Sequence, residues 1–398
     1  MGRRERRVAA TRYLEGLLLE GHRKSIEPMA ARLGVEAQNL QQFVADSPWS
    51  DEEVWSAIRR DIIPSFEPLE CWIVDESGWL KQGTHSVGVS HQYCGAVGKQ
   101  ANCQVSVELI VSDGSIGAPV AARLYLPESW TKDRERCQGA GVPEEVEFKT
   151  KPQIAIELID QALSGGVTPA PLLADSAYSD SWEFRQALRE RSLEFFLQVQ
   201  AAEHKGWTQE VAVVKKQKLS YVDVNAPPKR TLLQIAQDLP ASQWRHCTWK
   251  ARNGSTRGTR LAWVEIWLPR ALRKDQHELE KLWLVVDWPK GEVKPYHCYL
   301  ALFHQKPSQA RCLRLSRGRW QIEQYFQRSK DDLGLDHYEG RSWRGFHHHL
   351  VLSAAAYLFV VVMWARSKKN FWADVGNDPQ EDSAVAGEIM RVLSLVPP

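Results

Sequence analysis

The sequence predicts an α/β protein, α+β overall, with a mixed sheet, helices on both faces, a helical N-terminal domain and a β-rich insertion. Three observations support this class. Apolar residues recur at helical spacing within residues 1–66. From Leu69 to about Gln200, short apolar or alternating runs typical of strands are interspersed with helical stretches. Strand-like runs then dominate residues 201–305. Such an order favours a sheet covered by helices, with one segment inserted into it.

The composition is that of an ordinary globular protein and allows two or three domains. The chain has 398 residues, of which 43% are hydrophobic and 25% charged, and a formal net charge of +2. Its seven cysteines are scattered, with no C-x-x-C pair. They favour reduced thiols in a cytosolic protein over a disulfide framework or a zinc site. The charged N-terminus has no apolar core, so we do not expect a signal peptide.

Residues 1–66 are predicted to form a helical domain for DNA binding or assembly. The segment PMAARLGVEAQNLQQFV has a helix-turn-helix pattern, with Gly34 at the turn. Its second helix would expose Gln38 and Asn39, whose amides can read adenine edges. This helix carries no Lys or Arg, so a plain helical hairpin is the alternative interpretation.

Residues 67–200 are predicted to form the first part of the core. LECWIVDES, HSVGVSHQYC and NCQVSVELIVS are typical of an antiparallel meander. A helix over KPQIAIELIDQALSGG, a strand at PLLAD, a helix capped by Ser179 or Ser181, and a strand at EFFLQVQ follow. Three antiparallel strands followed by helix, strand, helix and strand is the order of ribonuclease H-like folds.

Residues 201–305 are predicted to form a β-rich insertion that contacts DNA. Between His204 and Lys274 there are 14 Lys or Arg, 4 Asp or Glu and five Trp. Basic residues interleaved with aromatics form the electrostatic and stacking surface expected for nucleic acid. We expect Lys215, Lys216 and Lys218 to contribute to it. The alternative is a strand-rich domain with tryptophans in its core and solvated cations.

Residues 306–368 are predicted to form the second part of the core, and 369–398 a polar tail with a short amphipathic helix. One helix is expected to run to Gly334. The uncharged run Leu350–Ala365 is shorter than the roughly 20 residues of a membrane helix, so a buried helix is favoured. Residues 347–349 are three consecutive histidines, about 100° apart on a helix. They suit polar contacts at a helix start, or DNA phosphates, better than one metal ion.

Three carboxylates are the candidate catalytic residues. Asp75 and Asp175 each end an apolar strand-like run, and Glu323 lies in the helix of the last core segment. Carboxylates at the carboxyl ends of strands lie at the edge of a sheet where α/β proteins bind ligands. Two of them with a third from a helix can hold paired Mg²⁺ ions for phosphodiester chemistry. Each Asp alone could be only a turn or capping residue, and Glu76 is an alternative ligand on the opposite face of its strand.

Two cations accompany Glu323 at helical spacing. Arg319 precedes it by four residues and Lys330 follows it by seven, which places all three on one stripe of a helix. The functional interpretation is that Arg319 and Lys330 grip phosphates beside the scissile bond. A solvated ladder of ion pairs is the alternative.

The chain resembles the DDE transposases of bacterial insertion sequences, specifically the group with a Tyr-x2-Arg-x3-Glu-x6-Lys signature and a β-strand insertion before it. The resemblance spans nearly the whole chain. It is carried by WIVDESGWLKQGTHSVGVSHQYCG, AARLYLPESW, LLADSAYSDSWEFRQAL and RGRWQIEQYFQRSKDDLGLDHYEGRSWRGFHHH. Arg319, Glu323 and Lys330 match the signature, whereas Ser316 replaces its Tyr and removes any contact that the Tyr would make.

The resemblance implies a ribonuclease H-like core with Asp75, Asp175 and Glu323 as ligands of two Mg²⁺ ions, for which Mn²⁺ can substitute. It also implies terminal inverted repeats and target DNA as double-stranded DNA partners, a homodimer in the synaptic complex, and no membrane partner. The expected location is the bacterial cytoplasm, with the nucleoid. A stand-alone ribonuclease H-like nuclease and a transposase-derived DNA-binding protein that no longer cuts are the competing functions.

Overall fold

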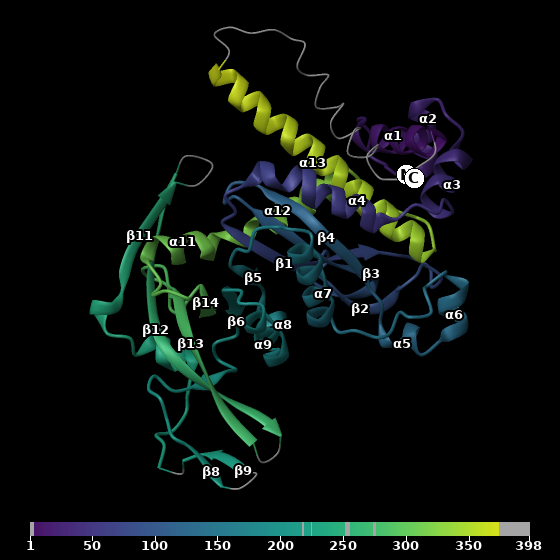
Figure 1. Ribbon diagram of the computed structural model, residues 1–398. Helices are drawn as coiled ribbons and strands as arrows, with labels where there is room; N and C mark the ends of the chain where they lie inside the picture. Colours follow the sequence, from purple (N-terminus) through teal and green to yellow (C-terminus); the bar gives the residue numbers. More distant parts are fainter. Residues whose placement is uncertain (1–3, 217–218, 224, 251–254, 274–275, 374–398) are drawn as a thin grey trace. The chain divides into compact units, whose positions relative to one another are not determined.

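The computed structural model describes residues 4–373 except 217–218, 224, 251–254 and 274–275. The chain divides into two compact units. Unit 1 comprises Met1–Pro169 and Trp320–Pro398, and unit 2 comprises Ala170–Arg319. The elements of both are labelled in Figure 1.

The first elements of unit 1 are helical, as predicted. They are α1 Arg4–Leu18, α2 Ile26–Leu33, α3 Ala37–Ala45 and α4 Asp51–Ala57, followed by a π turn Ile58–Ile62 and a 3₁₀ turn Ile63–Phe66. Gly34 ends α2 with a φ of 63°, a left-handed conformation that glycine adopts at little cost. Met29, Leu40 and Phe43 are buried where the pattern of the helical pair requires. The Ser50 hydroxyl caps α4 by accepting from the Glu53 amide.

The strands of unit 1 pair antiparallel. They are β1 Cys71–Leu80, β2 Ser90–Cys94, β3 Lys99–Ser112 and β4 Gly117–Tyr125, and β3 pairs with each of the others. Three details differ from expectation. The strand expected from His85 begins at Ser90, β4 was not anticipated, and β1 continues past Asp75 to Leu80. Asp75 therefore lies in the middle of its strand rather than at the end of it. The backbone hydrogen bonds that β1 makes with β3 outweigh the polarity of its last residues.

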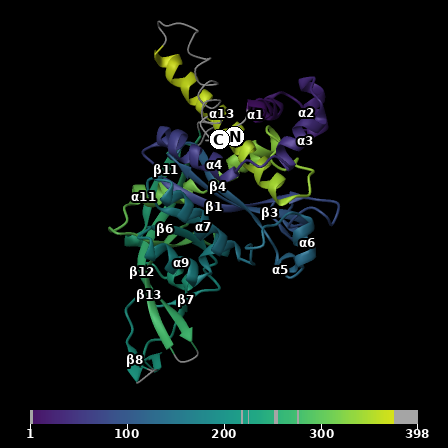
Figure 2. The ribbon, with the colours of Figure 1, turned by 45° about the vertical axis from the view of Figure 1, so that its right-hand side comes forward.

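Helices cover both faces of this sheet. One face packs against α7 Lys151–Ser164, which a Thr150 capping box begins and Gly165 ends. The other face packs against α12 Trp320–Asp331 and α13 Trp343–Ala373. Both views show the short helices α5 Glu128–Thr131 and α6 Arg134–Gly139 beside β3 (Figures 1 and 2).

The apolar run of α13 is buried, as predicted, with Leu350 and Leu352 inaccessible to solvent. Among the described residues, Trp343–Ala365 is the segment long and apolar enough for a membrane span, but 67% of its apolar 18-residue window is buried inside the protein. In both views α13 lies beside α1 and α3 (Figures 1 and 2).

The three consecutive histidines of α13 are buried, and each of them bonds to a backbone carbonyl, His347 to that of Trp343 at 2.9 Å. His348 meets the carbonyls of Val44 and Trp49, and His349 meets those of Gly334 and Leu335. The expectation of polar contacts at the helix start is confirmed. With 6% or less of each residue exposed, the alternative of DNA phosphate contacts is wrong.

Unit 2 combines parallel and antiparallel strands. Its sheet order is β11–β12–β13–β14–β6–β5, in which β5 and β6 are parallel and the other pairs antiparallel. Its elements are β5 Leu172–Ala174, α8 Ser176–Ser179, α9 Trp182–Glu190, β6 Phe195–Val199, β7 Lys205–Gly206, β8 Val213–Lys216, β9 Leu219–Val222, β10 Arg230–Thr231, α10 Leu232–Gln237, a 3₁₀ turn Ala241–Gln243, β11 Arg245–Lys250, β12 Thr256–Arg273, β13 Gln276–Asp287, β14 His297–Leu302 and α11 Gln309–Gly318.

Mixed strand pairing with helices on both faces confirms the predicted α/β class. The single helix expected to carry Glu323 is instead two, because α11 ends at Gly318 and α12 begins at Trp320. Glycine is a weak helix former, which favours an interruption at that point. The helix α13 runs through Ala373, past the expected start of the tail, and the amphipathic helix expected near the C-terminus lies outside the described residues.

Candidate active site

Asp75 and Glu76 point to opposite faces of the sheet, and the packing of unit 1 distinguishes them. Glu76 forms an ion pair of 2.5 Å with Lys151 of α7. Asp75 shares its face with Trp79, whose ring lies 4.3 Å from that of Phe346 on α13. Asp75 is therefore on the face that α12 and α13 cover. The Glu76 amide donates to Asp75 Oδ1 at 2.8 Å, which fixes the carboxylate along the strand.

Helix α12 lies along β1 and is held to the sheet by hydrogen bonds at its start, middle and end. At its start, Gln321 Nε2 donates to the Gly114 carbonyl at 3.2 Å, beside the first residues of β4. In its middle, the Tyr325 hydroxyl donates to Glu108 Oε2 at 2.8 Å. At its end, Lys330 Nζ donates to the Gly78 carbonyl at 3.0 Å.

The pairing of residues in the sheet shows in which direction α12 runs relative to β1. Gly117 pairs with Ser112, which pairs with Cys71 at the start of β1, whereas Gly78 is seven residues further on. The two anchors at its ends therefore make α12 follow β1 in the same direction. Its middle anchor, Glu108, is the direct cross-strand partner of Asp75.

Gly117 sets how closely α12 approaches β4. A Cβ atom at this position would lie 2.6 Å from Ile110 Cδ1 and 3.2 Å from the backbone oxygen of Gln321. The first distance is too short for real carbon atoms, and the second involves backbone that a rotamer change cannot move. A larger residue would require Ile110 Cδ1 to turn away and the Gln321 backbone to move by a few tenths of an ångström, so glycine favours the close approach of the first turn of α12, which carries Glu323.

Glu323 is exposed on the first turn of α12, and Asp75 is partly buried. Both belong to unit 1, and α12 packs against β1. Carboxylate oxygens are the ligands that Mg²⁺ takes in proteins, so the chemistry of these two side chains fits that ion.

Asp175 follows β5 and caps α8. Its Oδ1 accepts from the Ala177 amide at 3.0 Å, so the interpretation of this residue as a helix cap has direct support. Asp175 belongs to unit 2, and its convergence with Asp75 and Glu323 stays a prediction. Within the described part of the chain, no three His, Cys, Asp or Glu side chains form a ready metal-binding group.

The signature cations lie in different units. Arg319 is the residue after α11 in unit 2, whereas Lys330 lies in the last turn of α12 in unit 1. The expectation of one continuous helix bearing both is therefore wrong, since the helix divides at Arg319. At the signature Tyr position, Ser316 is buried and its hydroxyl donates to the Leu313 carbonyl at 2.9 Å.

The other expected DNA-binding residues that the structure describes lie on two elements, α3 and β8. Gln38 and Asn39 are exposed on α3. Lys215 and Lys216 lie in β8, and Lys218 lies outside the described residues.

The tryptophans of the basic segment are largely engaged within the protein. Trp207 is only 5% exposed. Arg260 lies 5.1 Å from the ring centre of Trp244, and Arg317 lies 4.3 Å from that of Trp249. These rings are therefore partly covered by the protein's own cations.

Two buried glutamates were missed from the sequence. Glu108 is fully buried and its carboxylate also accepts from the Ser106 hydroxyl at 2.7 Å. Burial raises the pKa of Glu108, against the opposing effects of its hydroxyl partners and of Lys330. A lone charge inside the apolar run QVSVELIVS was the signal that could have identified it.

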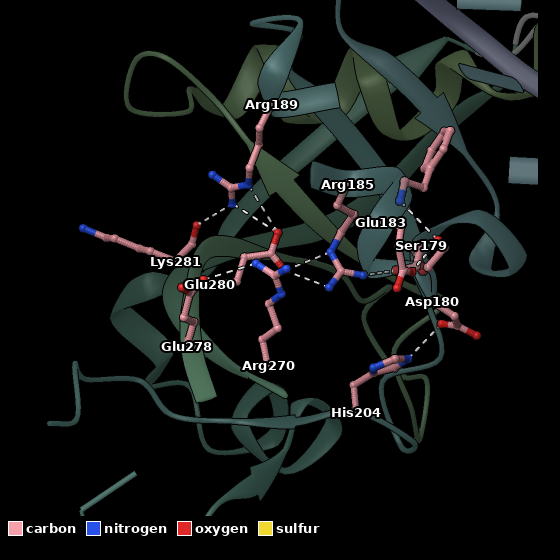
Figure 3. Close-up of polar contacts among 12 residues, drawn as sticks. Ser179, Asp180, Glu183, Arg185, Arg189, His204, Arg270, Glu278, Glu280 and Lys281 are labelled. Carbon is pink, nitrogen blue, oxygen red and sulfur yellow. Dashed lines mark hydrogen bonds and ion pairs between the residues drawn. The ribbon is translucent and has the colours of Figure 1, made fainter. Parts of the chain in front are cut away.

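The second missed acid is Glu280 of β13, which lies between two arginines of α9 (Figure 3). Arg185 approaches it at 2.7 Å and Arg189 at 3.2 Å. This cluster ties β13 to α9 within unit 2.

Comparison with known proteins identifies the family. Residues 1–257 match the family described as DDE superfamily endonuclease, a range that includes Asp75 and Asp175 and ends before Glu323. A protein of Microchaete diplosiphon named "Probable transposase for insertion sequence element IS701" is 28% identical over 223 residues. The match covers 54% of this chain and 54% of that protein, about half the length of each. The family match extends over more than half of the chain, which therefore belongs to the DDE superfamily of endonucleases, as its resemblance to DDE transposases predicted.

Proposed function

We propose that the protein is the DDE transposase of an insertion sequence. It binds the terminal inverted repeats, cleaves phosphodiester bonds there and transfers the 3′ ends to target DNA. The observation that best supports this proposal is the course of α12, which carries Glu323 along the face of β1 that bears Asp75. Family membership and the similarity to a probable insertion-sequence transposase support the same function.

Asp75, Asp175 and Glu323 are proposed to hold two Mg²⁺ ions, for which Mn²⁺ can substitute. When bound, such ions activate a water or a 3′-hydroxyl and stabilise the leaving oxygen. The protein's part is to fix three carboxylates around the scissile phosphate and to bind the phosphates on either side of it. Lys330 suits one such contact as a point charge, and Arg319 suits a bidentate one.

Much of the affinity for DNA is assigned to residues other than the three catalytic carboxylates. Gln38 and Asn39 are exposed on a helix that can present them to base edges. Lys215, Lys216 and Lys218 contribute contacts to the phosphate backbone. The proposed partners are double-stranded DNA and a second copy of the chain in the synaptic complex. The proposed location is the bacterial cytoplasm, at the nucleoid.

The decisive experiment substitutes Glu323→Gln and measures both binding and cleavage of duplexes that carry the element's end sequences, with Mg²⁺ present. The amide keeps the shape of the side chain but removes its charge. We expect cleavage to fall by roughly 10³-fold or more, with end binding almost unchanged, because phosphate and base contacts hold the DNA. The matched control is Glu145→Gln on the exposed connection before α7, which should cut like wild type.

Cleavage by Glu323→Gln at the wild-type rate would refute the assignment of the catalytic acid. A second assay separates the competing functions. Joining of a cleaved 3′ end to a target duplex supports transposition. Cleavage without joining favours a stand-alone nuclease, and end binding without cleavage by the wild type favours a DNA-binding protein derived from a transposase.

A further inference from the structure

Glu108 is a buried acid placed beside the candidate site without belonging to it. It lies on β3 directly opposite Asp75 and has no solvent exposure. Residues directly opposite each other in an antiparallel pair project from the same face, with Cβ atoms about 5 Å apart. The side chain of Glu108 is therefore on the same face as that of Asp75.

Both oxygens of the Glu108 carboxylate are bound by hydroxyl groups. Ser106, two residues earlier on the same strand, donates to Oε1 at 2.7 Å. Tyr325 of α12 donates to Oε2 at 2.8 Å. The first bond fixes the carboxylate on its own strand, and the second extends the connection to the helix.

Tyr325 is held as firmly as the acid it contacts. It has no solvent exposure, and its ring meets that of Tyr357 on α13 edge to face, with centres 4.9 Å apart. Tyr325 is two residues from Glu323 on the same helix.

We propose that Glu108 is a positioning residue. Through its hydrogen bond with Tyr325, it fixes the position of Glu323 along the direction of β1, relative to Asp75. The inference rests on the proposed function and deepens it. Strand β3 carries Glu108 and pairs with β1, so the Tyr325–Glu108 bond links the helix of one candidate ligand to the strand of the other. The Lys330–Gly78 bond holds the end of the helix. Of the three hydrogen bonds described above, the one with Glu108 is made by the residue directly opposite Asp75.

The competing role for Glu108 is that of a further metal ligand. A ligand needs its negative charge, whereas a positioning residue needs only its hydrogen bonds. Glutamine distinguishes the two roles, because a hydroxyl group can donate to its amide oxygen and accept from its amide nitrogen. Leucine has a similar size but offers neither contact.

The test compares Glu108→Gln, Glu108→Leu, Tyr325→Phe and the double variant Glu108→Leu/Tyr325→Phe. Tyr13→Phe is the matched control, since it also removes a buried tyrosine hydroxyl of unit 1, bonded to His349 at 2.8 Å rather than to Glu108. The first measurement is hydrogen exchange of residues 320–331 in EDTA, without DNA. The second is the Mg²⁺ concentration that gives half-maximal cleavage of end-sequence duplexes.

We expect Glu108→Leu and Tyr325→Phe to speed exchange in residues 320–331 about tenfold, because each removes the buried Tyr325–Glu108 hydrogen bond that ties α12 to β3. Both should also raise the Mg²⁺ requirement about tenfold, as loss of groups that orient metal ligands commonly does. Glu108→Gln should stay within about twofold of wild type in both measurements. The double variant should be no worse than Glu108→Leu.

A Glu108→Gln variant as impaired as Glu108→Leu would overturn the proposal in favour of a metal ligand. Unchanged exchange and Mg²⁺ requirement in Tyr325→Phe would overturn it as well. Failure of the proposed function has a different signature, since wild type and Tyr13→Phe would then not cleave the duplexes. In that case the exchange measurement, which needs neither metal nor DNA, still decides whether Glu108 holds α12.

Discussion

Among the residues that the structure describes, each unit buries one glutamate between a helix and a strand, and the two are neutralised differently. In unit 2, Glu280 of β13 is held by the guanidinium groups of Arg185 and Arg189 (Figure 3). In unit 1, Glu108 of β3 is held by the hydroxyls of Ser106 and Tyr325. Both acids are at most 7% exposed.

The difference follows from what lies nearby. Glu280 joins β13 to α9, where the two arginines neutralise its charge. Glu108 lies opposite Asp75, where an arginine would compete with a divalent ion for the carboxylate. Hydroxyl groups fix Glu108 without adding positive charge there. A buried acid beside a proposed cation site is thus held by neutral donors, whereas the buried acid of unit 2 is held by charged donors.

The largest effect on stability is expected from Glu280→Ala. Removing this carboxylate leaves Arg185, whose side chain is only 7% exposed, without its ion pair. An uncompensated buried charge costs about 3–5 kcal/mol in unfolding free energy. Glu278→Ala, two residues away and with its own side chain 57% exposed in its pair with Arg270, should change it by less than about 1 kcal/mol. Urea denaturation of both variants measures the contrast, and equal effects would mean that the buried cluster does not hold α9 to β13.

The next largest effect concerns pH and belongs to unit 1. His349 is satisfied as a neutral ring, since Tyr13 can donate to its Nδ1 while Nε2–H donates to the Gly334 or Leu335 carbonyl. Burial lowers the pKa of His349 from 6.5 to about 4. Because the folded pKa lies below the unfolded one, this stability is present above pH 6.5 and is lost as pH falls towards 4.

The shift corresponds to about 2–4 kcal/mol over that window. Denaturation at pH 7, 5.5 and 4.5 should therefore show a steep loss for the wild type and a shallower one for His349→Gln. The variant removes one titrating ring and leaves His348, whose pKa burial also lowers to about 4. Parallel pH profiles for the two proteins would contradict this account of His349.

The smallest effects are expected at helix caps, and here the two units should behave alike. Ser50 caps α4 in unit 1 and Ser181 caps α9 in unit 2, each by accepting from the amide three residues on, at 3.3 and 3.1 Å. Ser50→Ala and Ser181→Ala should each cost about 1 kcal/mol. Thermal unfolding measures both, and a cost above that of Glu280→Ala would reverse the proposed order of effects.

Local signals in the sequence were sufficient for most elements. The capping serines, the glycine between α2 and α3, and the alternation in β3 each depend on neighbours within a few residues, and the structure contains them as expected. The two buried glutamates could not be predicted in the same way. Their partners are 217 residues away for Glu108 with Tyr325, and 95 for Glu280 with Arg185.

The extent of β1 and the division at Arg319 were also beyond local patterns. The residues from Asp75 to Gly78 are too polar for a buried strand by themselves, but their partners on β3 satisfy the backbone. The spacing of the Arg–Glu–Lys signature is compatible with one helix, and a spacing cannot reveal where a helix is interrupted. The metal triad itself stays a prediction that needs residues from both units.

Gly117 gives experimental control over a spacing that is otherwise fixed by the fold. Because a Cβ there would meet Ile110 and the Gln321 backbone, each added carbon should act as a spacer between α12 and β4. A Gly117→Ala, Gly117→Ser and Gly117→Val series would then move the turn that bears Glu323 outward in steps, without altering any carboxylate. The dependence of cleavage rate on that series would measure how much displacement of one ligand the chemistry tolerates.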